Sequence, residues 1–557
     1  MKSKIVYLAV ALALVFSLAA AIVPAGPAVA AITINVPGDY ATIQAAVDAA
    51  NPGDTILVAA GTYAPFTVNG KTGPLTIKSQ DAANPAIVEG SQAYGTKNTI
   101  IVITDSTDIN LTDLDIEGDG LEGGDPPTIA NAYAVIYEDA TGEVKNCTIS
   151  PNTAQFSTVE EWGYAHGGHG IAIWNDDNTG IISNVTVNSC TIKEFGVSGV
   201  AILNGATATV KDNTIIGTVF NRVDWGVFQT GINVEAGYGH PTAPSTATIT
   251  GNEIYDVRNT TDVTGSMCYG IIINAYMFYV ASYAESTVHI TGNDIHDNSV
   301  GINANHASPE NAYAHFNNIY DNTIDGVLSC SDADAGFVEF DATNNWWGHA
   351  SGPYHPNSNP TGEGNRVRSY NALLWQTQQE VGAVDYDPWL EAPVGVVESE
   401  TITGTGTMSG TPTGGDVDID ATGDHEVTVA TYTSNPGGAT TFSATGHYWD
   451  VHLSDDTGVT SVTIDFCPVT YPTQIYYWDG ASWAPCSQQT YAAGCVVVTV
   501  TTGTHPSLAD LSGQGFGSGS PYPSVPAFPT TLAGILAAVA AGFVAFALRR
   551  RIISRKS

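Results

Sequence analysis

The chain has 557 residues, of which 55 are acidic and 17 are basic, and its formal net charge is −38 at pH 7. A surface with this charge repels nucleic acid and anionic lipid, which excludes a nucleic-acid-binding protein. Seven cysteines in such a long chain also exclude a scaffold that depends on disulfide bonds. The composition is that of an exported protein with an acidic, well-solvated surface.

The N-terminal stretch predicts a secretory signal. Lys2 and Lys4 precede an apolar run from Ile5 to Val23, and the stretch ends in Ala-Val-Ala-Ala. We therefore expect residues 1–31 to be a signal peptide that is cut near Ala30 or Ala31. The alternative, a retained membrane anchor, requires a longer apolar core.

A short helix is expected directly after this signal. Asp39 or Thr42 can cap a helix that runs to about Ala50, with apolar residues on one face: Ile43, Ala46, Val47 and Ala50. Asn-Pro-Gly-Asp at 51–54 ends it, and residues 55–59 read as a buried strand. Such a segment can cover the open end of a repetitive sheet, which otherwise invites pairing with other chains.

One short phrase then recurs along the chain. It reads Cys147-Thr-Ile149, Cys190-Thr-Ile192, Asn213-Thr-Ile215, Asn252-Glu-Ile254, Asn293-Asp-Ile295, Asn317-Asn-Ile319 and finally Asn344-Asn-Trp346. Between these phrases, segments rich in Val, Ile and Thr alternate apolar and polar residues at period two, which indicates strands. The repeat predicts an all-β solenoid in which the Ile side chains stack inside and a small polar residue stands at the corner before each of them. We expect Cys147 and Cys190 to be small buried core residues.

Two segments carry a resemblance to a known family. The stretch Val36–Tyr63 resembles the entry segment of right-handed parallel β-helix proteins of the pectin-lyase-like superfamily, and the resemblance implies this fold for residues 32–394. Residues 344–354 and 385–389 resemble the closing segment of secreted proteins with this helix and are expected to cover the far end of the core with aromatic rings. Enzymes of this superfamily act on acidic polysaccharides in a groove along one face. No catalytic motif of a lyase, hydrolase or esterase maps onto this chain.

One acidic run is a candidate calcium site. Alternation places Asp113, Asp115 and Glu117 on one face of a strand, with Leu114 and Ile116 buried. Adjacent carboxylates repel each other unless a cation or water separates them. The alternative is a solvated acidic face without calcium.

Two further clusters are candidate ligand-binding sites. The first is a loop that combines aromatic and titratable side chains: Trp162, Tyr164, His166, His169, Trp174, Asp176 and Asp177. The second comprises Arg222, Asp224 and Trp225, with Asp256 and Arg258 after the next phrase. If both lie on one side of the helix, the rings would stack on sugars and the polar groups would bind hydroxyls or a cation. The alternatives are a loop packed on its own rings and a surface ion pair of Arg222 with Asp224.

Two other functions are compatible with a β-helix. An anchored polysaccharide lyase or glycoside hydrolase would use the middle coils, but Lys is scarce there, which disfavours a lyase. A periplasmic-type metal-binding β-helix would use His289, His296, His306 and His315, whose spacing fits no known ligand set.

Residues 395–515 predict a second domain. Several short alternating runs and the hairpin signal Asp479-Gly480 indicate a β-sandwich stalk. Its aromatic residues are expected in the core, with carbohydrate binding as the alternative: Trp449, Tyr476, Tyr477, Trp478 and Trp483. Cys486 and Cys495 flank a turn and could form a disulfide bond, and Cys467 competes for either partner.

The C-terminus predicts a membrane anchor. A Gly/Ser/Pro-rich linker at 516–531 precedes the apolar span Leu532–Leu548 and a basic tail at 549–557 that should stay cytoplasmic. The run Val525–Thr530 with this span and tail resembles prokaryotic C-terminal sorting signals, although Ala527 replaces the usual acidic residue. The sequence thus predicts a right-handed parallel β-helix, a small β-sandwich and terminal apolar helices. The expected protein is exported, anchored to the cytoplasmic membrane at the cell surface, and binds polysaccharide or builds the envelope.

Overall fold

The computed structural model divides the chain into two compact units, Met1–Glu398 and Ser399–Ser557. It describes residues 30–118, 132–151, 168–176, 180–221, 228–236, 243–261, 267–274, 286–305, 311–331, 339–371, 384–410, 415–453, 456–511 and 515–521. Within these ranges no helix is long and apolar enough to cross a membrane. Residues 1–29 of the predicted signal peptide and the whole predicted C-terminal span lie outside them.

The first unit opens with the predicted cap. Strand β1 (Thr33–Val36) leads into helix α2 (Ile43–Ala49), and the Thr42 side chain accepts a hydrogen bond from the backbone N–H of Ala45 at 3.1 Å. Thr42 is therefore the N-cap, whereas Asp39 accepts from Asn35 instead. The helix buries Ile43, Ala46 and Val47, as the sequence predicted, because these residues fall on one face at helical spacing.

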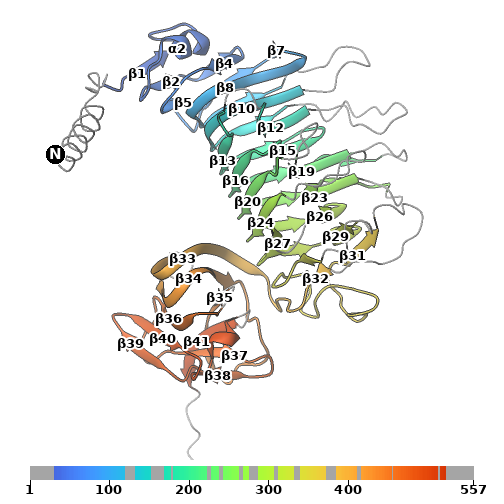
Figure 1. Ribbon diagram of the computed structural model, residues 1–557, viewed down its shortest axis with the longest axis vertical. Coiled ribbons are helices and arrows are strands. Elements are labelled where there is room, and N and C mark those ends of the chain that lie inside the picture. The colour runs from blue at the N-terminus through green and yellow to red at the C-terminus, as the bar shows by residue number, and fades with distance from the viewer. Residues whose placement is uncertain are drawn as a thin grey trace, which may run out of the picture. The chain divides into compact units, whose positions relative to one another are not determined.

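The rest of this unit is a parallel β-helix with three faces (Figure 1). The first face contains β4 (Phe66–Asn69), β8 (Lys97–Thr112), β10 (Ala132–Lys145), β12 (Gly168–Trp174), β15 (Ser198–Leu203), β19 (Phe228–Glu235), β23 (Met267–Asn274), β26 (Val300–Asn305), β29 (Asp325–Ser331) and β31 (Val367–Asn371). The second contains β1, β2 (Thr55–Val58), β5 (Leu75–Ser79), β13 (Asn184–Asn188), β16 (Thr207–Lys211), β20 (Thr246–Thr250), β24 (Thr287–Thr291), β27 (Ala312–His315), β30 (Phe340–Asp341) and β32 (Val384–Asp385). The third contains β3 (Gly61–Tyr63), β6 (Ala86–Glu89), β9 (Leu114–Glu117), β11 (Thr148–Ser150), β14 (Thr191–Lys193), β17 (Thr214–Ile216), β21 (Glu253–Tyr255), β25 (Asp294–His296) and β28 (Asn318–Tyr320).

Long strands join two of these faces. β8 and β10 run through both the first and the second face, so the strands of these faces form one 21-stranded sheet. β7 (Gln92–Tyr94) adds an antiparallel edge to β8, and β18 (Val219–Phe220) pairs with β22 (Arg258–Asn259).

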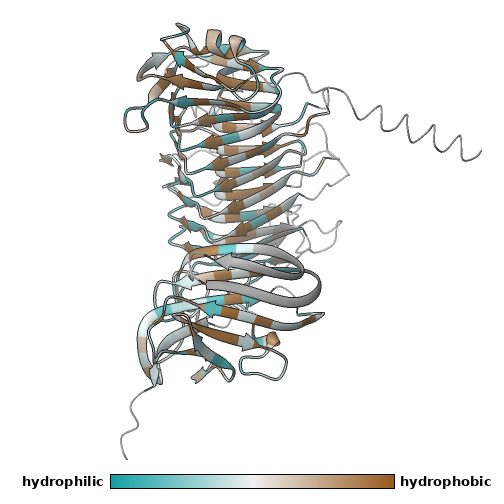
Figure 2. Ribbon diagram, turned by 90° about the vertical axis from the view of Figure 1, so that its left-hand side faces the viewer, coloured by the Kyte–Doolittle hydropathy of each residue, from teal (hydrophilic) through white to brown (hydrophobic). Residues whose placement is uncertain are grey.

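The recurring isoleucines form a continuous buried column on the third face. They pair in register from coil to coil and are all 0% exposed: Ile149, Ile192, Ile215, Ile254, Ile295 and Ile319. Apolar positions line up in the same way as brown bands along the stacked strands (Figure 2). The predicted stacking is confirmed, and its cause is the period-two pattern that turns every second side chain inward.

The polar residue of each phrase is also buried, and it forms a ladder of side-chain amides. The backbone N–H of each ladder residue donates to the side-chain oxygen of the ladder residue on the next coil, at 2.8–3.0 Å. The ladder residues are, in order, Cys190, Asn213, Asn252, Asn293, Asn317 and Asn345. The last position corrects the sequence prediction by one residue, because Asn345 rather than Asn344 enters the ladder. Trp347, fully buried, then occupies the place of the isoleucine.

The corner before each ladder position adopts the left-handed conformation. Its residues have φ between 52° and 68° from Asn146 onward: Asn146, Ser189, Asp212, Gly251, Gly292, Phe316 and Asn344. Asn, Asp and Gly tolerate this conformation best, which accounts for most of these positions. The corner turns the chain so that the next side chain points into the core.

Aromatic residues close the far end of the β-helix. Trp347 and Tyr386 belong to the core, and Trp389 packs against it. The predicted aromatic cover is thus confirmed.

The second unit is an antiparallel nine-stranded sheet. Its elements are β33 (Val394–Gly410), β34 (Gly415–Tyr432), β35 (Phe442–Leu453), β36 (Val459–Phe466), β37 (Gln474–Trp478), β38 (Trp483–Pro485), β39 (Gln489–Ala492), β40 (Cys495–Val500), the 3-10 helix η2 (Leu508–Asp510) and β41 (Gly515–Pro521). Four of the five aromatic residues considered for sugar stacking are buried at 7% exposure or less: Trp449, Tyr476, Tyr477 and Trp483. They are core residues, as expected, because Trp449 and Tyr477 belong to the hydrophobic core of this unit, and Tyr476 and Trp483 pack on the buried Phe442.

The structure shows which cysteines of the second unit form a disulfide bond. Cys467 and Cys495 form a disulfide bond, and Cys486 is a buried free thiol. Of the two predicted pairings of Cys495, the one with Cys467 is therefore present.

A buried carboxyl group makes the stability of the second unit depend on pH. Asp450 is 0% exposed and accepts a hydrogen bond from the Tyr432 hydroxyl at 2.7 Å. Burial raises the pKa of Asp450 from 3.8 to about 7. Between pH 4 and 7 the unfolded chain releases this proton while the folded unit retains it, so stability falls as the pH rises through this window.

We expect Asp450→Asn to stabilise the second unit at pH 8 by up to about 4 kcal/mol, since an amide keeps the acceptor and removes the charge. The advantage should disappear towards pH 4, where the carboxyl is neutral in both states. Guanidinium unfolding followed by tryptophan fluorescence at pH 4, 6 and 8 measures this, with the exposed Asp456→Asn as control. Equal stabilisation at all three pH values would contradict the titration of Asp450.

Candidate functional site

A cluster of aromatic and charged side chains lies on the outward side of the first face. Tyr133 on β10 pairs in register with His169 on β12, and their rings stack with centroids 4.8 Å apart and an interplanar angle of 10°. Trp174, at the end of β12, contacts the edge of Tyr133 at 5.5 Å. The parallel register thus brings residues 36 positions apart in the sequence into direct contact.

An ion pair completes this cluster. Lys97 on β8 contacts Glu138 on β10 at 3.2 Å, and its ammonium group lies 4.0 Å from the centroid of the Trp174 ring. The Tyr94 hydroxyl donates to the second carboxylate oxygen of Glu138 at 3.0 Å. We call Tyr94, Lys97, Tyr133, Glu138, His169 and Trp174 the aromatic cluster.

Burial fixes the protonation states in the aromatic cluster. It raises the pKa of Tyr94 and of Tyr133 to about 12, so both hydroxyls stay protonated at neutral pH. It lowers the pKa of His169 to about 4, so the imidazole is neutral. The Nδ1 atom of His169 is buried and has no hydrogen-bonding partner among the described residues. The cluster therefore offers hydroxyl and imidazole groups and aromatic rings, with one cation matched by one anion.

A row of amide side chains continues on the same outward side. Asn233 and Glu235 lie on β19, Asn274 on β23 and Asn305 on β26, and the Asn305 amide donates to Asn274 at 3.2 Å. The side-chain oxygens of Asn233 and Asn305 are buried and have no hydrogen-bonding partner within the described ranges. Burial also raises the pKa of Glu235. This row, which we call the amide row, has the polar groups that bind sugar hydroxyls.

The spacing of the two carboxyl groups on this side is too large for paired catalysis. Glu138 and Glu235 occupy the same register column, separated by Trp174 and Leu203. Three strand spacings amount to about 14 Å. Glycosidases hold their two carboxyl groups about 5 to 9.5 Å apart. These two residues therefore do not form a hydrolytic pair.

The structure brings together part of the first predicted cluster. His169 and Trp174 belong to the aromatic cluster, and Asp176 is exposed at the end of the same strand, where its backbone N–H donates to Asp139 at 2.8 Å. The other predicted ligand-binding residues lie outside the described residues: Trp162, Tyr164, His166, Asp177, Arg222, Asp224 and Trp225. In the sequence, Trp162 lies between β11 and β12, and Arg222 lies between β18 and β19. Both β12 and β19 are strands of the first face.

The remaining members of the aromatic cluster could not be recognised in the sequence. Tyr94, Lys97, Tyr133 and Glu138 stand in strands rather than in a loop, and they precede the recurring phrases. Only Tyr94 and Tyr133 are aromatic, and they stand on different strands, β7 and β10, so no local pattern in the sequence marks these four residues.

The predicted calcium residues do not converge on one point. Asp115 and Glu117 point outward from β9, whereas Asp113 lies at a left-handed corner with φ of 56° and accepts from Asn146 at 3.1 Å. Across the described part of the chain, no three His, Cys, Asp or Glu side chains are placed to hold a metal ion. Calcium binding at these residues stays a prediction.

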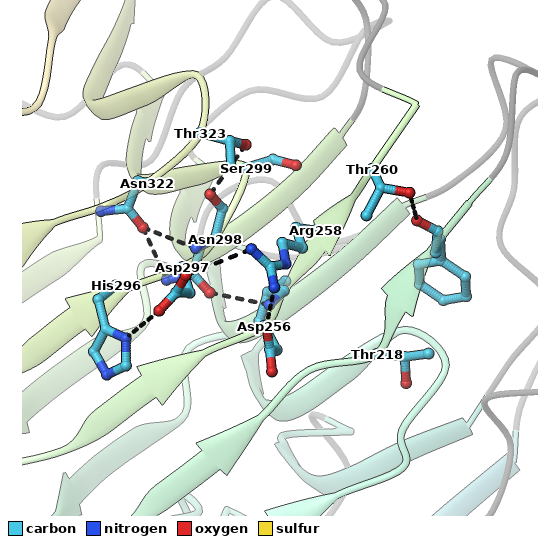
Figure 3. Close-up of polar contacts among 12 residues, drawn as sticks. Thr218, Asp256, Arg258, Thr260, His296, Asp297, Asn298, Ser299, Asn322 and Thr323 are labelled. Carbon is cyan, nitrogen blue, oxygen red and sulfur yellow. Dashed lines mark hydrogen bonds and ion pairs between the residues drawn. The ribbon is translucent and has the colours of Figure 1, made fainter.

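Charged residues at and just after the ends of β21 and β25 form a separate surface network with Arg258 on β22 (Figure 3). Arg258 contacts Asp256 at 2.9 Å and Asp297 at 3.5 Å, and Asp297 also contacts His296 at 3.0 Å. His296 stacks between Tyr255 and Tyr320. The ion pair of Asp256 and Arg258 is thus present, whereas the predicted ion pair of Arg222 and Asp224 lies outside the described residues. Stacking covers both faces of the His296 ring and one face each of Tyr255 and Tyr320.

The other predicted histidines also have local partners. His289 stacks on Tyr313 at 4.4 Å, and His315 contacts Asp341 at 2.9 Å. Burial alone would raise the pKa of Asp341, but the contact with His315 lowers it to about 2. His306 lies outside the described residues.

Comparisons with known proteins give likenesses of structure. No family model and no curated protein matches this sequence. Among solved structures, an alginate lyase from Paenibacillus sp. str. FPU-7 is 17% identical with a TM-score of 0.32, over 61% of this chain and 99% of that one. The Dettilon tailspike protein is 11% identical with a TM-score of 0.31, over 87% and 94%. A pectate lyase is 12% identical with a TM-score of 0.24, over 64% and 78%. At these values the likenesses say nothing about the activity of this chain.

Proposed function

We propose that this protein is an exported β-helix protein that binds polysaccharide along the outward side of its first face. The observation that carries the proposal is the aromatic cluster, where stacked rings, protonated hydroxyls and one ion pair share one side of the helix. Sugar-binding sites combine aromatic rings with a few placed polar groups. The amide row extends the same surface over further coils.

Binding is favoured over catalysis by the state of the ionisable groups. Lys97 and Glu138 neutralise each other, and Tyr94 also donates to the carboxylate, so neither charge is available as a general base or as a counter-ion for a uronate. Glu138 and Glu235 are about 14 Å apart. An anchored lyase or hydrolase therefore lacks support from the described residues of this face.

The proposed location is the cell surface. Its support is the sequence alone: the signal-like residues 1–31, the apolar span Leu532–Leu548 and the basic tail after it. The second unit would then act as a stalk, and we propose a β-sandwich arrangement for its strands.

Tyr133 and Trp174 are each 7% exposed, so the proposed sugar contact is with the exposed edge of these rings. Trp174→Ala should weaken polysaccharide binding several-fold, because one ring–sugar contact is worth about 1 kcal/mol. An array of neutral and uronate-containing oligosaccharides would identify the glycan, and calorimetry would then compare the variant with the wild type. Tyr255→Ala removes a ring from the third face and serves as the matched control. Equal binding by the wild type and a well-folded Trp174→Ala variant would reject the aromatic cluster as the site, and no binding by the wild type would favour an envelope structural role.

Deletion of residues 532–557 should release the protein into the medium, because the only predicted membrane anchor is removed. Cell fractionation with immunodetection measures this, with the full chain as control. Retention of the shortened protein in membranes after a high-salt wash would refute the proposed anchor.

A further inference from the structure

Two cysteines replace the amide at the start of the buried ladder. Thr148 pairs with Thr191, so the residues before them, Cys147 and Cys190, are direct neighbours on adjacent coils. Their exposed fractions are 1% and 2%, and both are free thiols in the structure. Cys147 and Cys190 thus occupy the first two positions of the ladder, and asparagines occupy it from Asn213 onward.

The two cysteines contact each other. The backbone N–H of Cys147 points at the Cys190 sulfur, 3.4 Å away, and the two thiols lie within hydrogen-bonding reach. Paired residues of adjacent parallel strands have Cα atoms about 4.8 Å apart. Disulfide bonds require roughly 4.4 to 6.8 Å, so the backbone needs no rearrangement to form one.

The ladder gives a reason to expect more than packing from this pair. An asparagine at either position would accept the neighbouring N–H and donate its own amide, as Asn252 does to Asn293 at 2.9 Å. A thiol is a weaker donor and acceptor than an amide. The Cys147 sulfur donates to the Lys145 carbonyl at 3.3 Å, and the Cys190 sulfur lies 3.4 Å from the carbonyls of Val144 and Asn188. These contacts are weaker than the amide bonds that the next coils keep, and a covalent link would offset the difference.

We propose that Cys147 and Cys190 form a disulfide bond between adjacent coils when the exported protein meets a small-molecule or protein disulfide. The two thiols lose two protons and two electrons as the new S–S bond forms. The external disulfide accepts these electrons and protons, and its own S–S bond breaks to give two thiols. The hydrogen bond from Cys147 lowers the pKa of Cys190, whereas burial raises the pKa of Cys147, so Cys190 is the first attacking thiolate. Because its exposed fraction is 2% in the folded coil, the attack takes place while the coil folds or opens.

The link would stabilise the coil that carries the candidate site. Residues 147–190 contain β12, with His169 and Trp174, and β13. A bond between the two ends of this coil closes the segment into a loop and reduces the conformational freedom of its unfolded form. The proposal rests on the export part of the proposed function and not on glycan binding.

The test uses the full chain incubated in a buffer of oxidised and reduced glutathione, then denatured with N-ethylmaleimide to block free thiols. A glutamate-specific protease separates the two cysteines by cleaving after Glu143, Glu160, Glu161 and Glu194. Mass spectrometry without reductant should show the fragment with Cys147 linked to the fragment with Cys190. The Cys467–Cys495 bond reports in the same sample that oxidation was sufficient, and Cys268 and Cys486 should be alkylated.

Alkylation of both Cys147 and Cys190 in a sample whose Cys467–Cys495 bond is intact would overturn the proposal. The stability of variants gives a second readout. Under oxidising conditions the double variant Cys147→Ser/Cys190→Ser should unfold several degrees below the wild type, and a reductant should remove most of this difference. A difference that the reductant leaves unchanged would indicate packing alone. Neither measurement depends on a glycan, so a failure here and a failure of glycan binding are distinguishable.

Discussion

Ile254→Asp is expected to unfold the coils around β21 and to destabilise the β-helix by about 4 kcal/mol or more. Ile254 is 0% exposed, with Ile215 and Ile295 as its register neighbours, so a carboxylate at this position would be buried without a partner. Because each coil of a solenoid contacts only its neighbours, the damage should spread outward from this position.

Hydrogen exchange of the backbone amides measures this effect, because exchange reports the opening of each coil separately. Protection should fall first in the strands beside β21. Thr248→Asp adds the same charge at an exposed position of β20 and should leave protection nearly unchanged. Similar loss of protection in both variants would show that charge, rather than burial, is responsible.

Asn293→Ala is expected to cost about 3 kcal/mol, since it breaks the amide ladder at its centre. The Asn293 oxygen accepts from the backbone and the side chain of Asn252, both at 2.9 Å, and its amide group donates to Ile249 and Asn317 at 2.9 Å. The substitution leaves these buried groups without partners.

Chemical unfolding and hydrogen exchange together check this prediction. Asn184→Ala is the matched control, because Asn184 is exposed on β13 and lies outside the ladder. If the two variants were equally stable, the ladder would contribute no more than an exposed amide, and its role in holding the coils together would have to be abandoned.

The positions of the recurring phrases could be found in the sequence, but the hydrogen bonds that their asparagines form could not. A buried isoleucine and a corner residue follow from alternation and spacing. That the asparagines bond one another required the register, because each donor and acceptor belong to different coils. Asn345 illustrates the difference: Asn344 fits the phrase equally well, and only the left-handed corner at Asn344 turns its neighbour inward.

The contacts within the candidate site could be predicted from the sequence even less than the ladder. Steps between the phrases range from 23 to 43 residues, since segments of unequal length separate the strands. The sequence therefore cannot tell which outward residues become neighbours. His169 and Trp174 stood out by composition, whereas their contacts with Tyr133 and Lys97 depend on the pairing of β8, β10 and β12.

The sequence by itself determined the all-β class, the repeat, the capping helix and the identity of the stacked core residues. These features follow from local periodicity and from turn residues, which act within a few positions of one another. The tertiary structure alone decided the amide ladder, the aromatic cluster and the pairing of Cys467 with Cys495. Each of these depends on register between strands that are far apart in the chain, and register is set by packing of the whole core.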